Sequence, residues 1–215
     1  MKSKAYYFFA AYPVLFAAGA VQIGKWLENH PKWNYAVAAV LFFPAIPFIP
    51  EATPILPIET YVEYMDKQEN EEGRIELTGD YADMFGWQEQ AALVDSVYQS
   101  LLTEYDPKEI MIWAENYGEA GTIKILGDKY GLPDPVSRHG SFWLWGYGDS
   151  NAEVWISLGN EKGSVEQVFE EVELVKIITH KYAIGEENGI PLYLCRKPKV
   201  DIEQWWQDYE SHVFD

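Results

Sequence analysis

The sequence contains a single cysteine, Cys195, among its 215 residues. One cysteine excludes an intrachain disulfide and any metal site that is built from several thiolates. Histidine is scarce too, and the four histidines are scattered without the paired spacing that is typical of zinc sites: His30, His139, His180 and His212. We therefore predict neither a metal nor a cofactor. The GxGxxG, GxxxxGKS/T and GxSxG patterns are also missing, so we assign no catalytic residue.

Basic residues are few in most of the chain. From Glu59 onward there are 12 Lys or Arg residues against 32 Asp or Glu residues, a net charge of −20. Such a surface favours solubility and argues against nucleic acid as a partner, because nucleic-acid binding needs basic stripes to meet the phosphates. It also disfavours docking onto anionic lipid headgroups.

Charged residues are missing altogether from two segments near the N-terminus. Residues 5–24 and 33–50 are uncharged, and a polar turn from Lys25 to Lys32 separates them. Each segment is close to the ~20 residues that an α-helix needs to cross a hydrocarbon core. We therefore predict a transmembrane helical hairpin in contact with a lipid bilayer. A cleaved signal peptide is the alternative for the first segment, because its basic start and the small residues near Ala18 fit that pattern.

The remainder of the chain alternates between helical and strand patterns. Apolar residues at helical spacing begin at Trp87, and strand-like runs occur at 109–114, 153–158, 174–179 and 192–195. Strands that alternate with helices favour a largely parallel sheet with helices on its faces. The predicted fold class is therefore α/β, with the helical hairpin in front of a soluble domain.

The predicted organisation has three parts. Residues 1–58 hold two transmembrane helices, at about 5–26 and 33–56. Residues 59–86 form a linker, and residues 87–215 form the soluble α/β domain.

The loop at 115–121 follows a predicted buried strand and opens a helix. In open α/β sheets, ligands gather at the carboxyl ends of strands, and a helix N-terminus offers free amide groups. Asn116 and Glu119 are therefore candidate substrate-binding residues. The structural alternative is that the two glycines of this loop serve only the geometry of a strand-to-helix turn.

The segment SRHGSFWLWGYGD, residues 137–149, is rich in aromatic residues beside hydrogen-bonding groups. Aromatic faces with polar neighbours suit carbohydrate, which presents apolar C–H faces and polar rims. We take His139, Trp143 and Trp145 as further candidate substrate-binding residues. The alternative is that alternate aromatic residues of this segment pack into the core.

Several motifs resemble the C-terminal part of bacterial membrane glycosyltransferases of the family 39 group, which is related to dolichyl-phosphate-mannose protein mannosyltransferases and includes RgtA/B/C/D-like proteins. The matching segments run in order along the chain: KAYY (4–7) with YPVLFAAGAV (12–21), ADMFGW (82–87), NYGEAG (116–121), YGLP (130–133), His139 with WLWG (143–146), and EN (187–188) with LYLCR (192–196). The sequence departs from this pattern at Ser3 and Arg138, where glycine is usual, and at Gly140, where asparagine is usual.

The resemblance implies a function and a location. Such enzymes take sugar from a polyprenyl-phosphate donor at the outer face of the bacterial inner membrane and pass it to a glycan or lipid acceptor. Their catalytic acidic residues lie in a first extracytoplasmic loop, and this chain begins after the corresponding position. Lys4, Tyr6 and Tyr7 would lie near the lipid phosphate of the donor, although a lysine there also suits a plain interfacial anchor. The acidic domain would then be extracytoplasmic.

Three functional hypotheses follow. The leading one is a C-terminal fragment of a polytopic glycosyltransferase, which we expect to transfer no sugar by itself. The alternative is a free-standing, membrane-anchored carbohydrate-binding or accessory module. The third is an enzyme that acts through the loop at 115–121 of the soluble domain.

Overall fold

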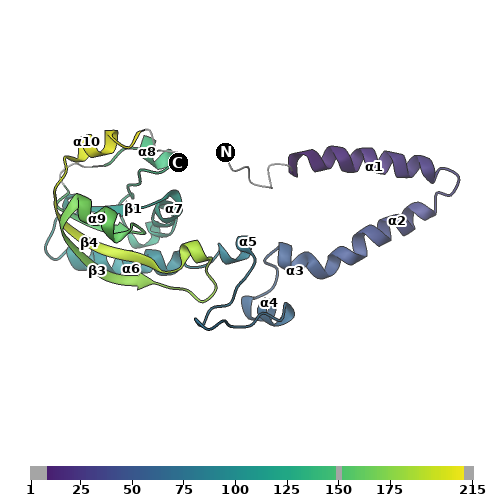
Figure 1. The fold of residues 1–215 in the computed structure, drawn as a ribbon, viewed down its shortest axis with the longest axis horizontal. Helices are drawn as coiled ribbons and strands as arrows, with labels where there is room; N and C mark the ends of the chain where they lie inside the picture. Colours follow the sequence, from purple (N-terminus) through teal and green to yellow (C-terminus); the bar gives the residue numbers. More distant parts are fainter. Residues whose placement is uncertain (1–8, 149–151, 211–215) are drawn as a thin grey trace. The chain divides into compact units, whose positions relative to one another are not determined.

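The computed structural model of the protein describes residues 9–148 and 152–210 (Figure 1). The chain divides into two compact units, Met1–Tyr61 and Val62–Asp215, with the boundary inside the short helix α4 (Ile58–Tyr64). The candidate residues Lys4, Tyr6 and Tyr7 lie outside the described residues.

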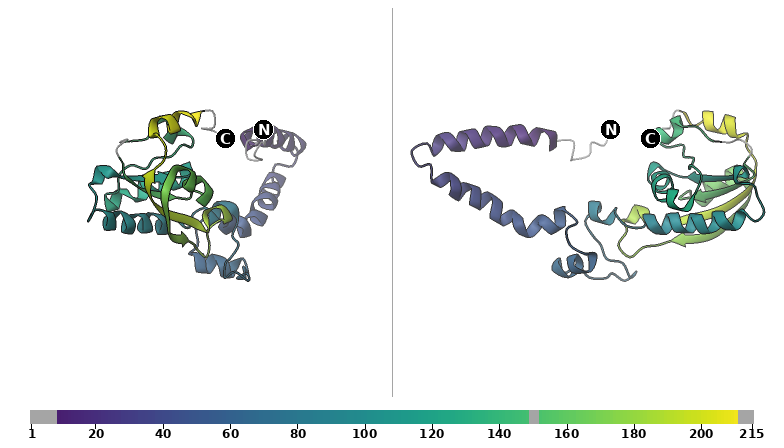
Figure 2. Two further views of the ribbon diagram at one scale, coloured as in Figure 1. Left: turned by 60° about the vertical axis from the view of Figure 1, so that its left-hand side comes forward. Right: turned by 180° about the vertical axis from the view of Figure 1, so that it is seen from behind.

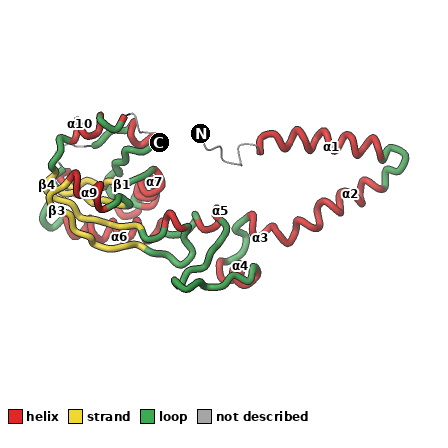
Figure 3. The backbone as a smooth tube through the Cα atoms, in the orientation of Figure 1, coloured by secondary structure: helices red, strands yellow, loops and turns green. Residues whose placement is uncertain are grey.

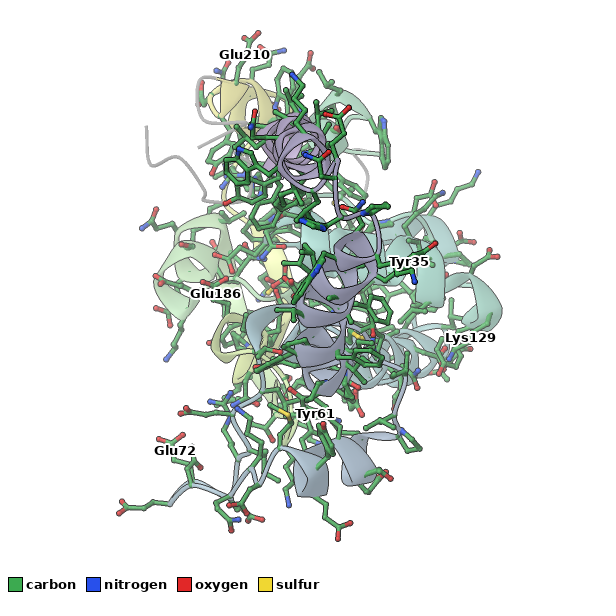
Figure 4. All side chains as sticks on the ribbon, turned by 90° about the vertical axis from the view of Figure 1, so that its right-hand side faces the viewer. Tyr35, Tyr61, Glu72, Lys129, Glu186 and Glu210 are labelled. Atoms are coloured by element: carbon green, nitrogen blue, oxygen red, sulfur yellow. The ribbon has the colours of Figure 1, made fainter. Side chains whose placement is uncertain are left out.

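The first unit is helical in its described part. It contains α1 (Tyr12–Trp26), α2 (Trp33–Phe42), the 3-10 helix η2 (Phe43–Phe48) and α3 (Ile49–Ala52). Between α2 and α3 the α-helix changes to the 3-10 helix η2, which contains Pro44 and Pro47. Proline has no N–H to donate to an α-helical ladder, so the regular α-helix is interrupted there. Figure 4 labels Tyr35 of α2. The side chain of Tyr35 is 80% exposed.

One stretch of the described residues, Trp33–Ala52, is a helical run both long enough and apolar enough to cross a membrane, judged by length and composition. The described part of α1 has 15 residues, fewer than a span of a hydrocarbon core needs. The structure thus contains one apolar candidate helix near the N-terminus, and the two-helix membrane hairpin stays a prediction.

The second unit combines helices with one sheet (Figure 3). Its helices are α5 (Gly79–Ala82), α6 (Trp87–Leu101), α7 (Tyr117–Leu126), α8 (Ser141–Leu144), α9 (Lys162–Val168) and α10 (Ile202–Gln207). Short 3-10 helices lie at η3 (Pro107–Glu109), η4 (Asp128–Tyr130) and η5 (Gly185–Glu187). The strands are β1 (Ile110–Ala114), β2 (Val154–Leu158), β3 (Phe169–Ile178) and β4 (Ile190–Pro198). The predicted linker at 59–86 contains α5, with Tyr81 and Ala82 buried.

The sheet has the order β1-β2-β4-β3, and only β1 and β2 run parallel. Strand β4 is antiparallel to both β2 and β3. The prediction of a largely parallel sheet is therefore wrong, although the mixed helix and strand content is confirmed. The connection from β3 to β4, residues 179–189, holds only a short 3-10 turn. A parallel crossover needs a longer connection, usually with a helix, so these two strands pair as neighbours in opposite directions.

Each face of the sheet carries its own apolar cluster, because successive strand side chains point to opposite faces. Ile110 and Ile112 of β1 pack with α6 and α7 on one face. Met111 and Trp113 of the same strand pack with α9 and α10 on the other. Figure 2 shows the helices on both sides of the strands. Because β1 and β2 run parallel, the loops that follow them lie at the same end of the sheet, and the candidate residues Asn116 and Glu119 lie at the start of α7 directly after β1.

Candidate functional site

Asn116 and Glu119 build the start of helix α7. The Asn116 side chain accepts a hydrogen bond from the Gly118 N–H at 2.6 Å, and the Glu119 carboxylate accepts one from the Asn116 N–H at 3.2 Å. This reciprocal pair is a capping box, which satisfies N–H groups that the first turn of a helix leaves unpaired. Two of the sequence-predicted binding residues therefore hold the loop in shape.

The carboxyl group of Glu119 is buried close to other carboxylates. Its side chain is 1% exposed, and burial together with the nearby carboxylates of Glu187 and Glu115 raises its pKa from 4.5 to about 7. Glu187 is itself buried and accepts a hydrogen bond from Gln90 Nε2 at 3.3 Å. Burial also raises the pKa of Glu187. Within the described ranges, no group of three acidic, histidine or cysteine side chains is arranged to hold a metal ion.

Gly159 makes room for this buried carboxylate. It follows β2, its φ is +83°, and a Cβ at this position would lie 2.8 Å from Glu119 Oε1. The neighbouring carboxyl ends of β1 and β2 thus enclose Glu119, and the side chain has no access to a ligand in solution. The structure favours a structural role for Glu119.

A short chain of hydrogen bonds connects His139 to Glu115, the residue that follows the carboxyl end of β1. The Ser137 hydroxyl donates to the Glu115 carbonyl at 3.3 Å and accepts from the His139 N–H at 3.3 Å. The His139 ring then meets the exposed ring of Tyr117 in an edge-to-face contact with centroids 5.0 Å apart. His139 and Tyr117 form a small aromatic surface at the start of α7.

The two candidate tryptophans of the 143–146 segment have different surroundings. Trp143 packs against the apolar cluster that includes Val136, and its indole N–H donates to the Trp206 carbonyl at 3.3 Å. Trp145 is 67% exposed, and its ring lies 4.5 Å from that of Phe142 in an edge-to-face contact. Trp143 is therefore a packing residue, whereas Trp145 is available to a ligand.

Trp145 and Phe142 line a cavity of about 190 Å³ between α7, α8 and the loop before α8. Its rim carries an ion pair, Lys124 Nζ to Asp134 Oδ1 at 2.5 Å. The full lining consists of Lys124, Asp134, Pro135, Val136, Phe142, Trp145, Gly146 and Gly148. Sequence reasoning missed Lys124 and Asp134, because they stand ten residues apart with no motif to join them.

A larger cavity of about 490 Å³ lies near the amino end of β2 and the carboxyl end of β4, away from the loops after β1 and β2. It is lined by Tyr105, Ala152, Glu153, Glu171, Arg196, Lys197 and Pro198. Lys197 forms an ion pair with Glu171, and Arg196 forms one with Glu173. Carboxylates of strand β3 thus pair with the cationic side chains of this cavity, and Tyr105 is the one aromatic residue among its described lining residues.

No protein-family model, curated protein or solved structure matches the chain. An exposed indole, a second ring at an angle to it and an adjacent ion pair offer an apolar platform with both hydrogen-bond donors and acceptors at its rim.

Proposed function

We propose that the second unit binds a saccharide at the cavity beside Trp145, and that the chain serves as the C-terminal part of a polytopic membrane glycosyltransferase. The observation that carries the binding proposal is the exposed Trp145 ring next to Phe142, with the Lys124–Asp134 ion pair at the rim of the same cavity. A sugar ring has C–H faces that suit the indole and hydroxyl groups that suit a carboxylate and an ammonium.

The transferase half of the proposal is supported by the ordered sequence motifs and by the apolar helical run Trp33–Ala52. In this proposal the first unit lies in a lipid bilayer and the acidic second unit faces the outer side of the bacterial inner membrane. The sugar donor is a polyprenyl-phosphate sugar, and the acceptor is a glycan or a lipid. We assign no catalytic residue to the chain itself, so we expect the purified chain to transfer no sugar.

The test is direct binding by the full chain, purified in detergent or nanodiscs. A panel of neutral mono- and disaccharides is screened by saturation-transfer NMR, and the best ligand is titrated to obtain Kd. Covering about 60–80 Å² of indole surface stabilises a complex by about 1.5–2 kcal/mol, so Trp145→Ala should weaken binding by at least about tenfold.

Leu144→Ala is the matched control. Leu144 is 66% exposed at the last position of α8, directly before Trp145, but it does not line the cavity, so its truncation should leave Kd unchanged. Equal affinities in the two variants, or no saccharide bound by the native chain, would sink the binding proposal. Sugar transfer by the purified chain from a polyprenyl-phosphate donor would contradict the proposed division of labour while leaving the binding site intact.

A further inference from the structure

Arg138 lies between aromatic rings near the C-terminal helix. Its guanidinium carbon is 3.9 Å from the ring centroid of Trp205, 4.0 Å from that of Tyr209 and 5.8 Å from that of Trp113. Trp205 is in turn fixed by edge-to-face contacts with Trp113 and Trp155, at 5.2 Å and 5.8 Å between centroids. The guanidinium therefore has a defined position, set by the core of the unit.

The charge of Arg138 has no counter-ion among the described residues. No described residue accepts a hydrogen bond from it or forms an ion pair with it, although acidic residues greatly outnumber basic ones in this unit. The other two arginines differ: Arg74 Nη2 donates to the Ala183 carbonyl at 2.8 Å, and Arg196 pairs with Glu173 at 3.9 Å. Burial lowers the pKa of Arg138 to about 10, so the group is still charged at neutral pH.

A half-buried, unpaired charge is costly unless something pairs with it. Cation–π contacts with two rings offset part of that cost, but they engage the flat faces of the guanidinium, and its N–H edge has no acceptor in the part of the chain that the structure describes. That edge is a fork of parallel donors, which matches two oxygens of a carboxylate or a phosphate.

We propose that Arg138, held by Trp205 and Tyr209, is a binding site for an oxyanion, either the phosphate or the carboxylate group of a small ligand. The site is separate from the cavity at Trp145, since none of its three residues lines that cavity. The oxyanion proposal can therefore be tested independently of the saccharide proposal.

The chain contains only three arginines, which makes the test specific. The Nε–Hε resonances of Arg74, Arg138 and Arg196 in the ¹⁵N-labelled full chain are followed while inorganic phosphate, or methyl glucuronide as the carboxylate probe, is added at constant ionic strength set with chloride. We expect a saturable shift of the Arg138 resonance alone. A response to phosphate only, to carboxylate only, or to both supports the proposal and identifies the group.

Arg138→Lys keeps the charge but loses the planar fork, and should weaken binding by about tenfold or more. Arg196→Lys is the matched control and should leave the affinity unchanged. Tyr209→Leu retains the guanidinium and removes one wall, so it should weaken binding less than Arg138→Lys does. Absence of a saturable Arg138 shift with either probe, or equal affinity of native chain and Arg138→Lys, would overturn the proposal.

Discussion

The buried carboxyl of Glu119 makes the stability of the second unit depend on pH in an unusual direction. In the unfolded chain this carboxyl has its ordinary pKa of 4.5, whereas in the folded state burial and the carboxylates of Glu187 and Glu115 raise the pKa to about 7. The folded state thus binds the proton more tightly. By linkage, the free energy of unfolding falls as pH rises from about 4.5 to about 7. Below that window Glu119 costs nothing, and above it the whole penalty is present.

The size of the penalty follows from the two pKa values. A change in pKa from 4.5 to about 7 corresponds to about 3 kcal/mol, and the near-complete burial of the side chain leaves little solvent screening to reduce it. Glu119→Gln removes the charge, and a glutamine at this position of a capping box still reaches back to the Asn116 N–H. We expect the variant to be as stable as the native chain near pH 4.5 and more stable by up to about 3 kcal/mol at pH 8.

The assay is urea unfolding of the full chain at a series of pH values, followed by the fluorescence of the buried tryptophans Trp113 and Trp155. Glu109→Gln is the matched control, because Glu109 occupies the same place in the capping box at η3 and accepts from the Asp106 N–H at 2.8 Å. Parallel pH–stability curves for native chain and Glu119→Gln would show that the reasoning about Glu119 is wrong.

Two further predictions concern the core of the second unit. Gly159→Ala should lower the free energy of unfolding by about 1–3 kcal/mol, because the position has a positive φ and the new Cβ would lie 2.8 Å from Glu119 Oε1. Gly163→Ala, on α9 with no atom near its added Cβ, should raise the free energy of unfolding by about 0.5–1 kcal/mol. Urea unfolding measures both changes, and an unchanged stability of Gly159→Ala would contradict this prediction. Cys195 is fully buried with a pKa raised to about 12, so a thiol reagent at pH 8 should label it only as fast as the unit opens; labelling at the rate of a free thiol would be the contrary result.

Local patterns in the sequence predicted the positions of individual helices and strands better than they predicted which strands pair with one another. Helix α6 begins at Trp87 as its spacing indicated, and β1 and β2 lie within a residue of the predicted runs. The prediction of parallel strands was wrong because the relative directions of the strands depend on which strands become neighbours in the sheet. Strand β3 is mostly exposed and rich in glutamate, so its sequence gives little indication that it pairs at the edge of the sheet.

The site shows the same limit at the level of single side chains. The alternation in the WLW sequence suggested that Trp143 and Trp145 pack on the same side of the chain, as alternate residues of a strand do. The segment instead forms the short helix α8 and a turn, where residues two apart face different directions. The Lys124–Asp134 pair depends on the chain reversal at Gly131, whose φ is +73°. Such a contact is a property of the folded loop, and no local periodicity encodes it.

Strand β3 has a consequence for how the protein behaves at high concentration. As an edge strand of ten residues it has backbone groups available for a further strand, and Leu174 and Ile177 are exposed along it. Four charged side chains, Glu170, Glu171, Glu173 and Lys176, interrupt this edge, and a register shift between Leu174 and Lys176 breaks the regular ladder. Both features raise the cost of edge-to-edge association. The edge of this sheet is thereby protected against growth into an aggregate.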